Sequence, residues 1–71
     1  MSGEPITITV NGAPRRVATG LTLPRLLEEL GLTGPGTAVA VNEEVVRRDD
    51  YGRVTLRPGD RVEVIQAVGG G

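Results

Sequence analysis

The residues that point most directly to chemistry are the last three, Gly69, Gly70 and Gly71. Glycine has no side chain, so a run of glycines can enter a narrow channel in another protein. Such a run could bring the Gly71 carboxylate to a reactive site of that protein, with the partner supplying positioning and charge stabilisation. The ordinary alternative is a frayed terminus with no function.

The other residue types offer little catalytic chemistry. The chain has no Cys and no His, and all eight of its cationic side chains are Arg. Thiol catalysis, thiolate metal sites, the commonest general base and a lysine nucleophile are therefore excluded. The acidic pairs Glu28-Glu29 and Asp49-Asp50 are expected to be solvated, because a chain this short has little depth for a cleft. We expect no bound cofactor or metal, and a protein that other enzymes act upon rather than an enzyme.

Size and charge limit the remaining classes of function. A chain of 71 residues forms one small domain, and its net charge of −1 argues against binding to a nucleic acid. The first ten residues lack the pattern of a signal peptide, and no apolar run is long enough to span a membrane. We therefore expect a cytoplasmic protein with a folded domain over residues 1–66 and a flexible tail over residues 67–71 that carries the reactive carboxylate.

The first half of the chain predicts a hairpin and a helix. Residues 6–10 alternate apolar and polar side chains, as a half-buried strand does, and Asn11-Gly12 is typical of a type I′ turn into a second strand over residues 15–18. Thr22 is a candidate N-cap, and Gly31 suits the left-handed position after the helix. The helix carries one apolar stripe, formed by Leu23, Leu26, Leu27 and Leu30.

The second half predicts three more strands. Residues 37–41 are small and apolar, which suits a central strand, and Asn42 begins a turn into a short strand in the segment 44–48. A Pro-Gly turn over residues 57–60 leads to the last strand, residues 61–68. In that strand Val62 and Val64 share the buried face, which leaves Ile65 as an apolar residue on the outward face. Together with Ala67 and Val68, Ile65 is a candidate for docking to a partner; the alternative is an ordinary place in the strand.

The order of these elements predicts the fold class. Strand, strand, helix, strand, short strand and strand make an α+β domain in which one helix covers one face of a mixed sheet of four to five strands. This is the layout of the β-grasp, or ubiquitin-like, fold.

Four segments carry a family resemblance across nearly the whole chain: "VNG", "LPRLLEELGL", "VAVNEEVVRRDDY" and "LRPGDRVEVIQAVGGG". Taken in this order, they resemble the ThiS family, the sulfur carriers of bacterial thiazole synthesis in thiamin biosynthesis. The chain departs from the pattern in its third glycine, since much of the family ends in two.

This resemblance implies a set of partners. Gly71 would be adenylated by an E1-like, ThiF-type adenylyltransferase that uses ATP, with Gly69 and Gly70 inserted into its active site. Because the chain has no Cys, the sulfur would come from a separate persulfide donor, a cysteine desulfurase or a sulfurtransferase. The resulting thiocarboxylate would then be presented to a ThiG-type thiazole synthase.

Three other functions fit the same fold. The small subunit of molybdopterin synthase shares the tail and the logic of activation. A ubiquitin-like modifier would transfer Gly71 to a lysine of a target protein. A binding module of the TGS type would use the fold without any chemistry at its end, although the chain has no basic face.

Overall fold

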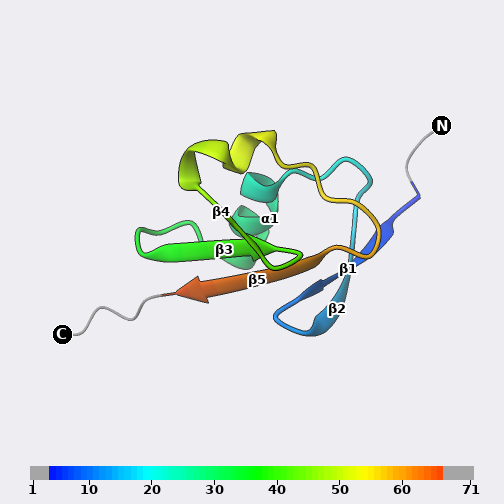
Figure 1. Cartoon of the computed structure of the whole chain (residues 1–71). Helices are drawn as coiled ribbons and strands as arrows, with labels where there is room; N and C mark the ends of the chain where they lie inside the picture. The colour runs from blue at the N-terminus through cyan, green and yellow to red at the C-terminus, as the bar shows by residue number, and fades with distance from the viewer. Residues whose placement is uncertain (1–3, 67–71) are drawn as a thin grey trace.

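The computed structural model of the chain describes residues 4–66 and shows one sheet covered by one helix (Figure 1). The α+β layout expected from the sequence is confirmed, and the predicted tail lies outside the described residues. The strands are β1 (Ile6–Val10), β2 (Ala13–Val17), β3 (Thr37–Val41), β4 (Glu44–Val46) and β5 (Arg61–Gln66); α1 spans Leu23–Leu30, and the 3-10 helix η1 spans Arg48–Arg53.

The sheet has the strand order β2-β1-β5-β3-β4. Strands β1 and β5 run parallel over two residue pairs, and every other neighbouring pair is antiparallel. Strand β3 has a neighbour on each side, as its small apolar residues predicted, but β5 is the middle strand. Strand β2 begins at Ala13 rather than at residue 15, because the two-residue turn places Ala13 directly opposite Val10.

Both hairpins turn through two residues with positive φ. Asn11 (φ 51°) and Gly12 (φ 84°) form the predicted type I′ turn between β1 and β2. Asn42 (φ 54°) and Glu43 (φ 72°) connect β3 to β4 in the same way. Asparagine adopts this left-handed conformation more readily than most residues, whereas Glu43 occupies a position where glycine is usual.

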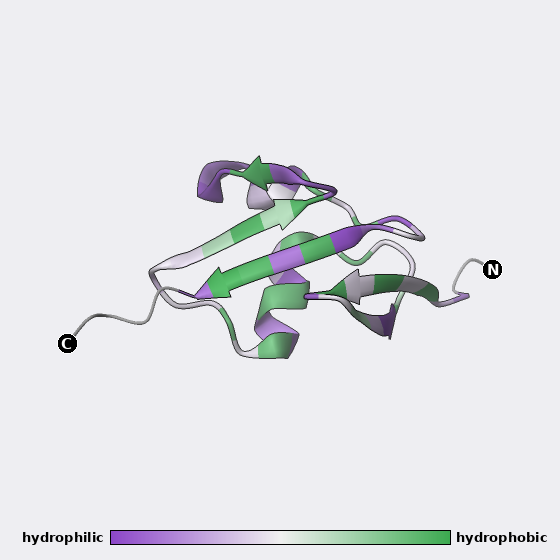
Figure 2. Cartoon of the chain, turned by 60° about the horizontal axis from the view of Figure 1, so that its bottom comes forward, coloured by the Kyte–Doolittle hydropathy of each residue, from purple (hydrophilic) through white to green (hydrophobic). Residues whose placement is uncertain are grey.

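Helix α1 packs its leucine stripe against the inner face of the sheet. Leu23, Leu26 and Leu27 are buried and Leu30 is partly buried, which confirms the predicted stripe. Figure 2 shows the apolar and polar residues of α1 in different colours. The helix ends at Gly31 in the left-handed conformation (φ 72°). The complete core comprises Ile8, Val17, Leu23, Leu26, Leu27, Val39, Leu56, Val62 and Val64.

The start of α1 is held by backbone pairing rather than by a side-chain cap. Thr22 occupies the N-cap position, but its side chain makes no capping hydrogen bond. Instead, the Leu23 N–H donates to the Val54 carbonyl (3.0 Å) and the Leu56 N–H donates to the Leu21 carbonyl (2.9 Å). This crossing buries Leu56 in the core, a role that the sequence had not indicated.

In the part of the chain that the structure describes, no helix is long and apolar enough to cross a membrane.

Candidate functional site

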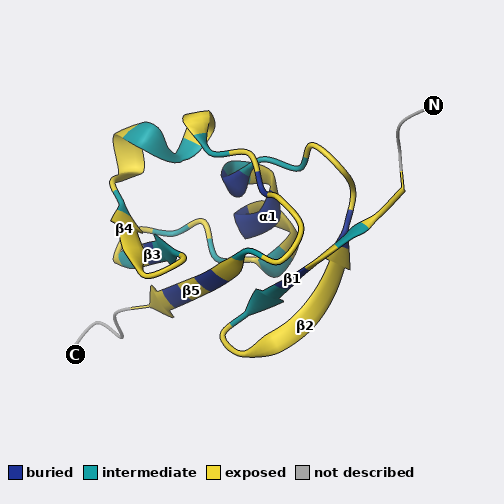
Figure 3. Cartoon of the chain, turned by 45° about the vertical axis from the view of Figure 1, so that its right-hand side comes forward, coloured by how far each residue is buried: buried dark blue, intermediate teal, exposed yellow. Residues whose placement is uncertain are grey.

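Strand β5 presents different side chains to the two faces of the sheet. Val62 and Val64 are buried against the core, whereas Ile65 is 67% exposed on the outer face. The alternating bands of burial along β5 are visible in Figure 3. The predicted inward and outward assignment of these residues is thus confirmed, and Ile65 is an exposed large apolar residue next to the last described residue, Gln66.

The register of the sheet places other apolar residues on the same face. Ile65 is opposite Ala38 of β3, and Ala40 of β3 is opposite Val45 of β4, which is 78% exposed. Side chains that pair across neighbouring strands lie on one face of the sheet. We call Ile65, Ala38, Ala40 and Val45 the outer patch. The small side chains of its two alanines lie between the larger side chains of Ile65 and Val45.

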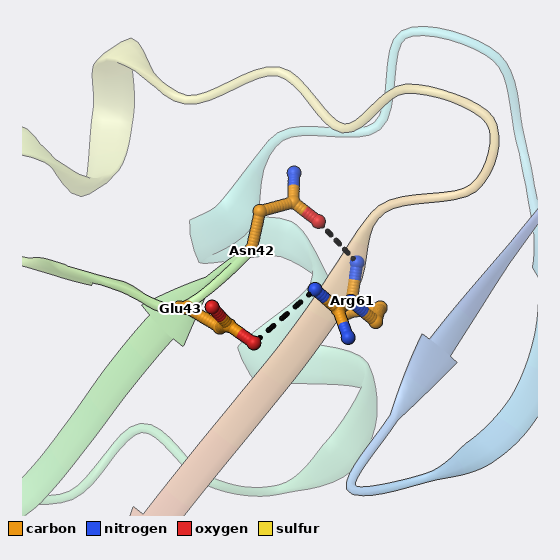
Figure 4. A network of polar contacts seen from close by, with 3 residues as sticks. All are labelled: Asn42, Glu43 and Arg61. Carbon is orange, nitrogen blue, oxygen red and sulfur yellow. Dashed lines mark hydrogen bonds and ion pairs between the residues drawn. The ribbon is translucent and has the colours of Figure 1, made fainter.

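Charged side chains lie beside the outer patch on the same face. The Arg61 guanidinium donates to Oε2 of Glu43 at 3.4 Å, and both side chains are largely exposed (Figure 4). Glu63 lies between Arg61 and Ile65 along β5 and is opposite Ala40. The outer side of β5 therefore changes from charged at Arg61 to apolar at Ile65. An apolar patch with a polar margin is the usual composition of a transient protein interface.

The inner side of the fold carries a groove between α1 and η1. It has a volume of about 220 Å³, and its lining includes Leu27, Leu32, Thr37 and Tyr51. The Tyr51 hydroxyl donates to the Thr37 carbonyl at the long distance of 3.5 Å. Within residues 4–66, no three acidic side chains are grouped so that they can hold a metal ion.

The remaining predicted site residues lie outside the described residues. These are Ala67 and Val68, proposed for docking, and the glycines Gly69, Gly70 and Gly71. What the structure establishes is where they begin: Gln66 is the last residue of β5 and is opposite Thr37, the first residue of β3. Ile65 and Ala38 of the outer patch therefore lie at the end of the sheet where the described part of β5 ends.

Comparison with known proteins gives the family. The sequence profile of the ThiS family matches residues 8–71. The sulfur carrier protein ThiS of Thermus thermophilus is 41% identical over 64 residues, which cover 90% of this chain and 98% of that protein. The sulfur carrier protein ThiS of Escherichia coli is 31% identical over 64 residues, which cover 90% of this chain and 97% of that protein.

A larger protein and a solved structure extend the comparison. A protein of Magnetococcus marinus named thiazole synthase is 42% identical over 64 residues, which cover 90% of this chain; this chain spans only 20% of that protein's length. The crystal structure of the thiamine biosynthesis protein ThiS from Geobacter metallireducens superposes with a TM-score of 0.80 at 35% identity, covering 93% of this chain and 100% of that chain. Sequence and fold together show that this chain belongs to the ThiS family of sulfur carrier proteins of thiamin biosynthesis, with a β-grasp fold.

Proposed function

We propose that this protein carries sulfur on the carboxyl group of Gly71. An oxygen of the carboxylate attacks the α-phosphorus of ATP on a ThiF-type adenylyltransferase, and pyrophosphate leaves. The terminal sulfur of a persulfide donor then attacks the acyl carbon and AMP leaves, which gives an acyl disulfide. A thiol cleaves the sulfur–sulfur bond, so that a disulfide forms on the donor side and the carrier keeps a thiocarboxylate.

The observation that carries this proposal is the family match, which extends to residue 71 and so includes the glycine run. The chemistry of the chain agrees with it, because the sequence has neither Cys nor His and relies on partners for activation. We place these steps in the cytoplasm, where ATP is present. The match to the ThiS family favours thiamin biosynthesis over molybdopterin synthesis.

Thiazole synthase is the proposed acceptor of the sulfur. Two proteins with that name, from Magnetococcus marinus and Paramagnetospirillum magneticum, each contain a 64-residue region similar to this chain, at 42% and 34% identity. A carrier-like region within the same polypeptide as a synthase supports a working relation between the two. For this chain we propose that the thiocarboxylate sulfur passes to a ThiG-type synthase during thiazole formation.

The outer patch is the proposed docking surface for the adenylyltransferase. Ile65 lies beside Gln66, five residues before Gly71 in the sequence. Contacts between the outer patch and the adenylyltransferase would therefore help to place the Gly71 carboxylate near the ATP bound by that enzyme. Binding free energy from a remote surface can position a reacting group in this way. Ala67 and Val68 would extend the same contact toward Gly69 and Gly70.

The intact mass of the protein tests the proposal. After incubation with a ThiF-type adenylyltransferase, ATP and a cysteine desulfurase with cysteine, we expect a mass gain equal to the exchange of one oxygen for one sulfur, located in the C-terminal peptide. A variant without Gly70 and Gly71 is the control, and it should melt like the wild type but gain no sulfur. An unchanged wild-type mass, while a known carrier gains sulfur in the same mixture, would contradict the proposal.

A further inference from the structure

Two asparagines, one from each hairpin turn, hold β5 from opposite sides. Asn42 donates its backbone N–H to the Arg61 carbonyl (2.7 Å), and its Oδ1 accepts the Arg61 N–H (2.9 Å), as Figure 4 shows for the side-chain bond. Asn11 donates its backbone N–H to the Val62 carbonyl (2.8 Å), and its Oδ1 accepts the Val64 N–H (2.8 Å). Each turn residue thus makes one backbone and one side-chain bond to the same strand.

The Asn11 side chain extends the ladder between β1 and β5 by one step. Backbone pairing of the two strands ends at Val10 and Val62, because β1 turns away at Asn11. In a continuing parallel ladder, the Val64 N–H would donate to the next backbone carbonyl of β1. The amide oxygen of Asn11 takes the place of that carbonyl, and the left-handed backbone at φ 51° allows it.

This bond lies at the end of β5 that continues into the glycine run. On the β3 side, pairing continues as far as Gln66 opposite Thr37. On the β1 side, within the described residues, the Asn11 side chain makes the last hydrogen bond to β5. Asn42 binds β5 at Arg61, the first residue of the strand, whereas the side chain of Asn11 binds it at Val64, near the other end. The two asparagines therefore hold different parts of the strand.

We infer that Asn11 is a positioning residue for the reaction at Gly71. This inference rests on the proposed function, because it assigns to Asn11 the fixing of the base from which the glycine run extends. If the last residues of β5 are held on one side only, the position of the carboxylate in the partner's active site becomes less defined. Reacting groups are sensitive to displacements of about 1 Å, so this loss of definition slows adenylation.

Three variants separate positioning from stability. Asn11→Gly removes the acceptor but keeps the backbone conformation, since glycine adopts positive φ freely. Asn11→Asp restores a side-chain oxygen and also suits the turn. Asn42→Gly is the matched control: it removes the equivalent bond at Arg61 and also a bond from Nδ2 to the Asp60 carboxylate (3.0 Å), so it costs at least as much stability.

The first measurement is amide hydrogen exchange of the free protein. We expect faster exchange at the Val64 N–H in Asn11→Gly than in Asn11→Asp or Asn42→Gly. The second is kcat/KM for adenylate formation by a ThiF-type adenylyltransferase, which we expect to fall about fivefold or more in Asn11→Gly because the carboxylate is placed less precisely. Asn11→Asp should recover most of this loss, and Asn42→Gly should stay near the wild type.

The outcomes distinguish this inference from the proposed function. If the enzyme does not adenylate the wild type at all, the proposed function fails. The exchange measurement is independent of the enzyme: unchanged exchange at Val64 in Asn11→Gly would show that Asn11 does not anchor the end of β5. If the wild type is active but Asn11→Gly and Asn42→Gly lose activity equally, or Asp does not rescue, Asn11 has no positioning role beyond stability.

Discussion

The substitution Ile65→Asp tests whether the outer patch docks the carrier to its adenylyltransferase. Complete burial of an isoleucine side chain contributes about 1.5–3 kcal/mol. Ile65 is 67% exposed in the free carrier, so about two thirds of this amount, or roughly 1–2 kcal/mol, is still to be gained on docking. Losing it weakens binding by about 5- to 30-fold, and a carboxylate forced into an apolar contact adds a further desolvation cost.

The fold should not respond to the same substitution. Ile65 points away from the core, so we expect the free energy of unfolding of Ile65→Asp to change by less than about 1 kcal/mol. Its neighbour Val64 is only 8% exposed, and Val64→Asp should prevent stable folding because it buries an unpaired charge. Urea unfolding followed by circular dichroism measures both effects.

The docking assay is the Kd for a ThiF-type adenylyltransferase, measured by calorimetry. The control is Thr7→Asp, which adds the same charge to the same face of the sheet on β1. From the parallel register, Thr7 lies six residue steps from Ile65 along the strand direction, or about 20 Å. Unchanged binding of Ile65→Asp would refute the docking surface, and equal weakening by Thr7→Asp would show that added charge alone is responsible.

Two further predictions concern the fold itself. Leu27 is 3% exposed between the helix and the sheet, so Leu27→Ala should lower the free energy of unfolding by about 2–5 kcal/mol. Urea unfolding measures this change, and overlapping curves for variant and wild type would contradict the core assignment. The second prediction concerns Pro14 in β2, the outermost strand of the sheet. Pro14 lies opposite Thr9, and the Thr9 N–H points away from β2 because it donates to the Asp60 carbonyl. In an antiparallel pair of this kind the Pro14 nitrogen also points away from its partner strand, toward the open edge of the sheet. Pro14→Thr would give this edge a free N–H and should promote self-association. Sedimentation should then detect more dimer for the variant than for the wild type at equal concentration, and equal sedimentation would show that the edge is protected by other means.

Local sequence patterns were sufficient for the elements whose periodicity is regular. The alternation in residues 6–10, the Asn11-Gly12 turn and the leucine stripe of α1 each specify a local structure that the tertiary fold preserves. Residues 48–56 have no such periodicity. Leu56 is buried because its segment crosses the start of α1, and a contact between segments so distant in sequence leaves no local signal.

The same limit applies to the candidate site. Ile65 could be assigned to the outer face because the valines on either side of Glu63 define the inward face of a long strand. Val45 lies in a strand of three residues with two adjacent valines, so only the pairing of Ala40 with Val45 decides which of them faces outward. The bond from Val64 to Asn11 joins residues 53 positions apart and likewise depends on the complete sheet.

In the proposed function, the outer patch and the glycine run would have complementary tasks in binding. Ile65 and Val45 together offer about 2–4 kcal/mol of burial, from their exposed fractions of 67% and 78%. Association itself costs an estimated 4 to more than 15 kcal/mol in lost translational and rotational freedom, so the patch alone cannot hold a partner tightly. In the proposed function, contacts along the inserted glycines and at the charged margin of the patch would contribute the rest of the affinity. In the proposed function those contacts end at the Gly71 carboxylate, so its conversion to a thiocarboxylate would change the affinity for each enzyme. A carrier with one docking surface could then leave the adenylyltransferase and bind the synthase.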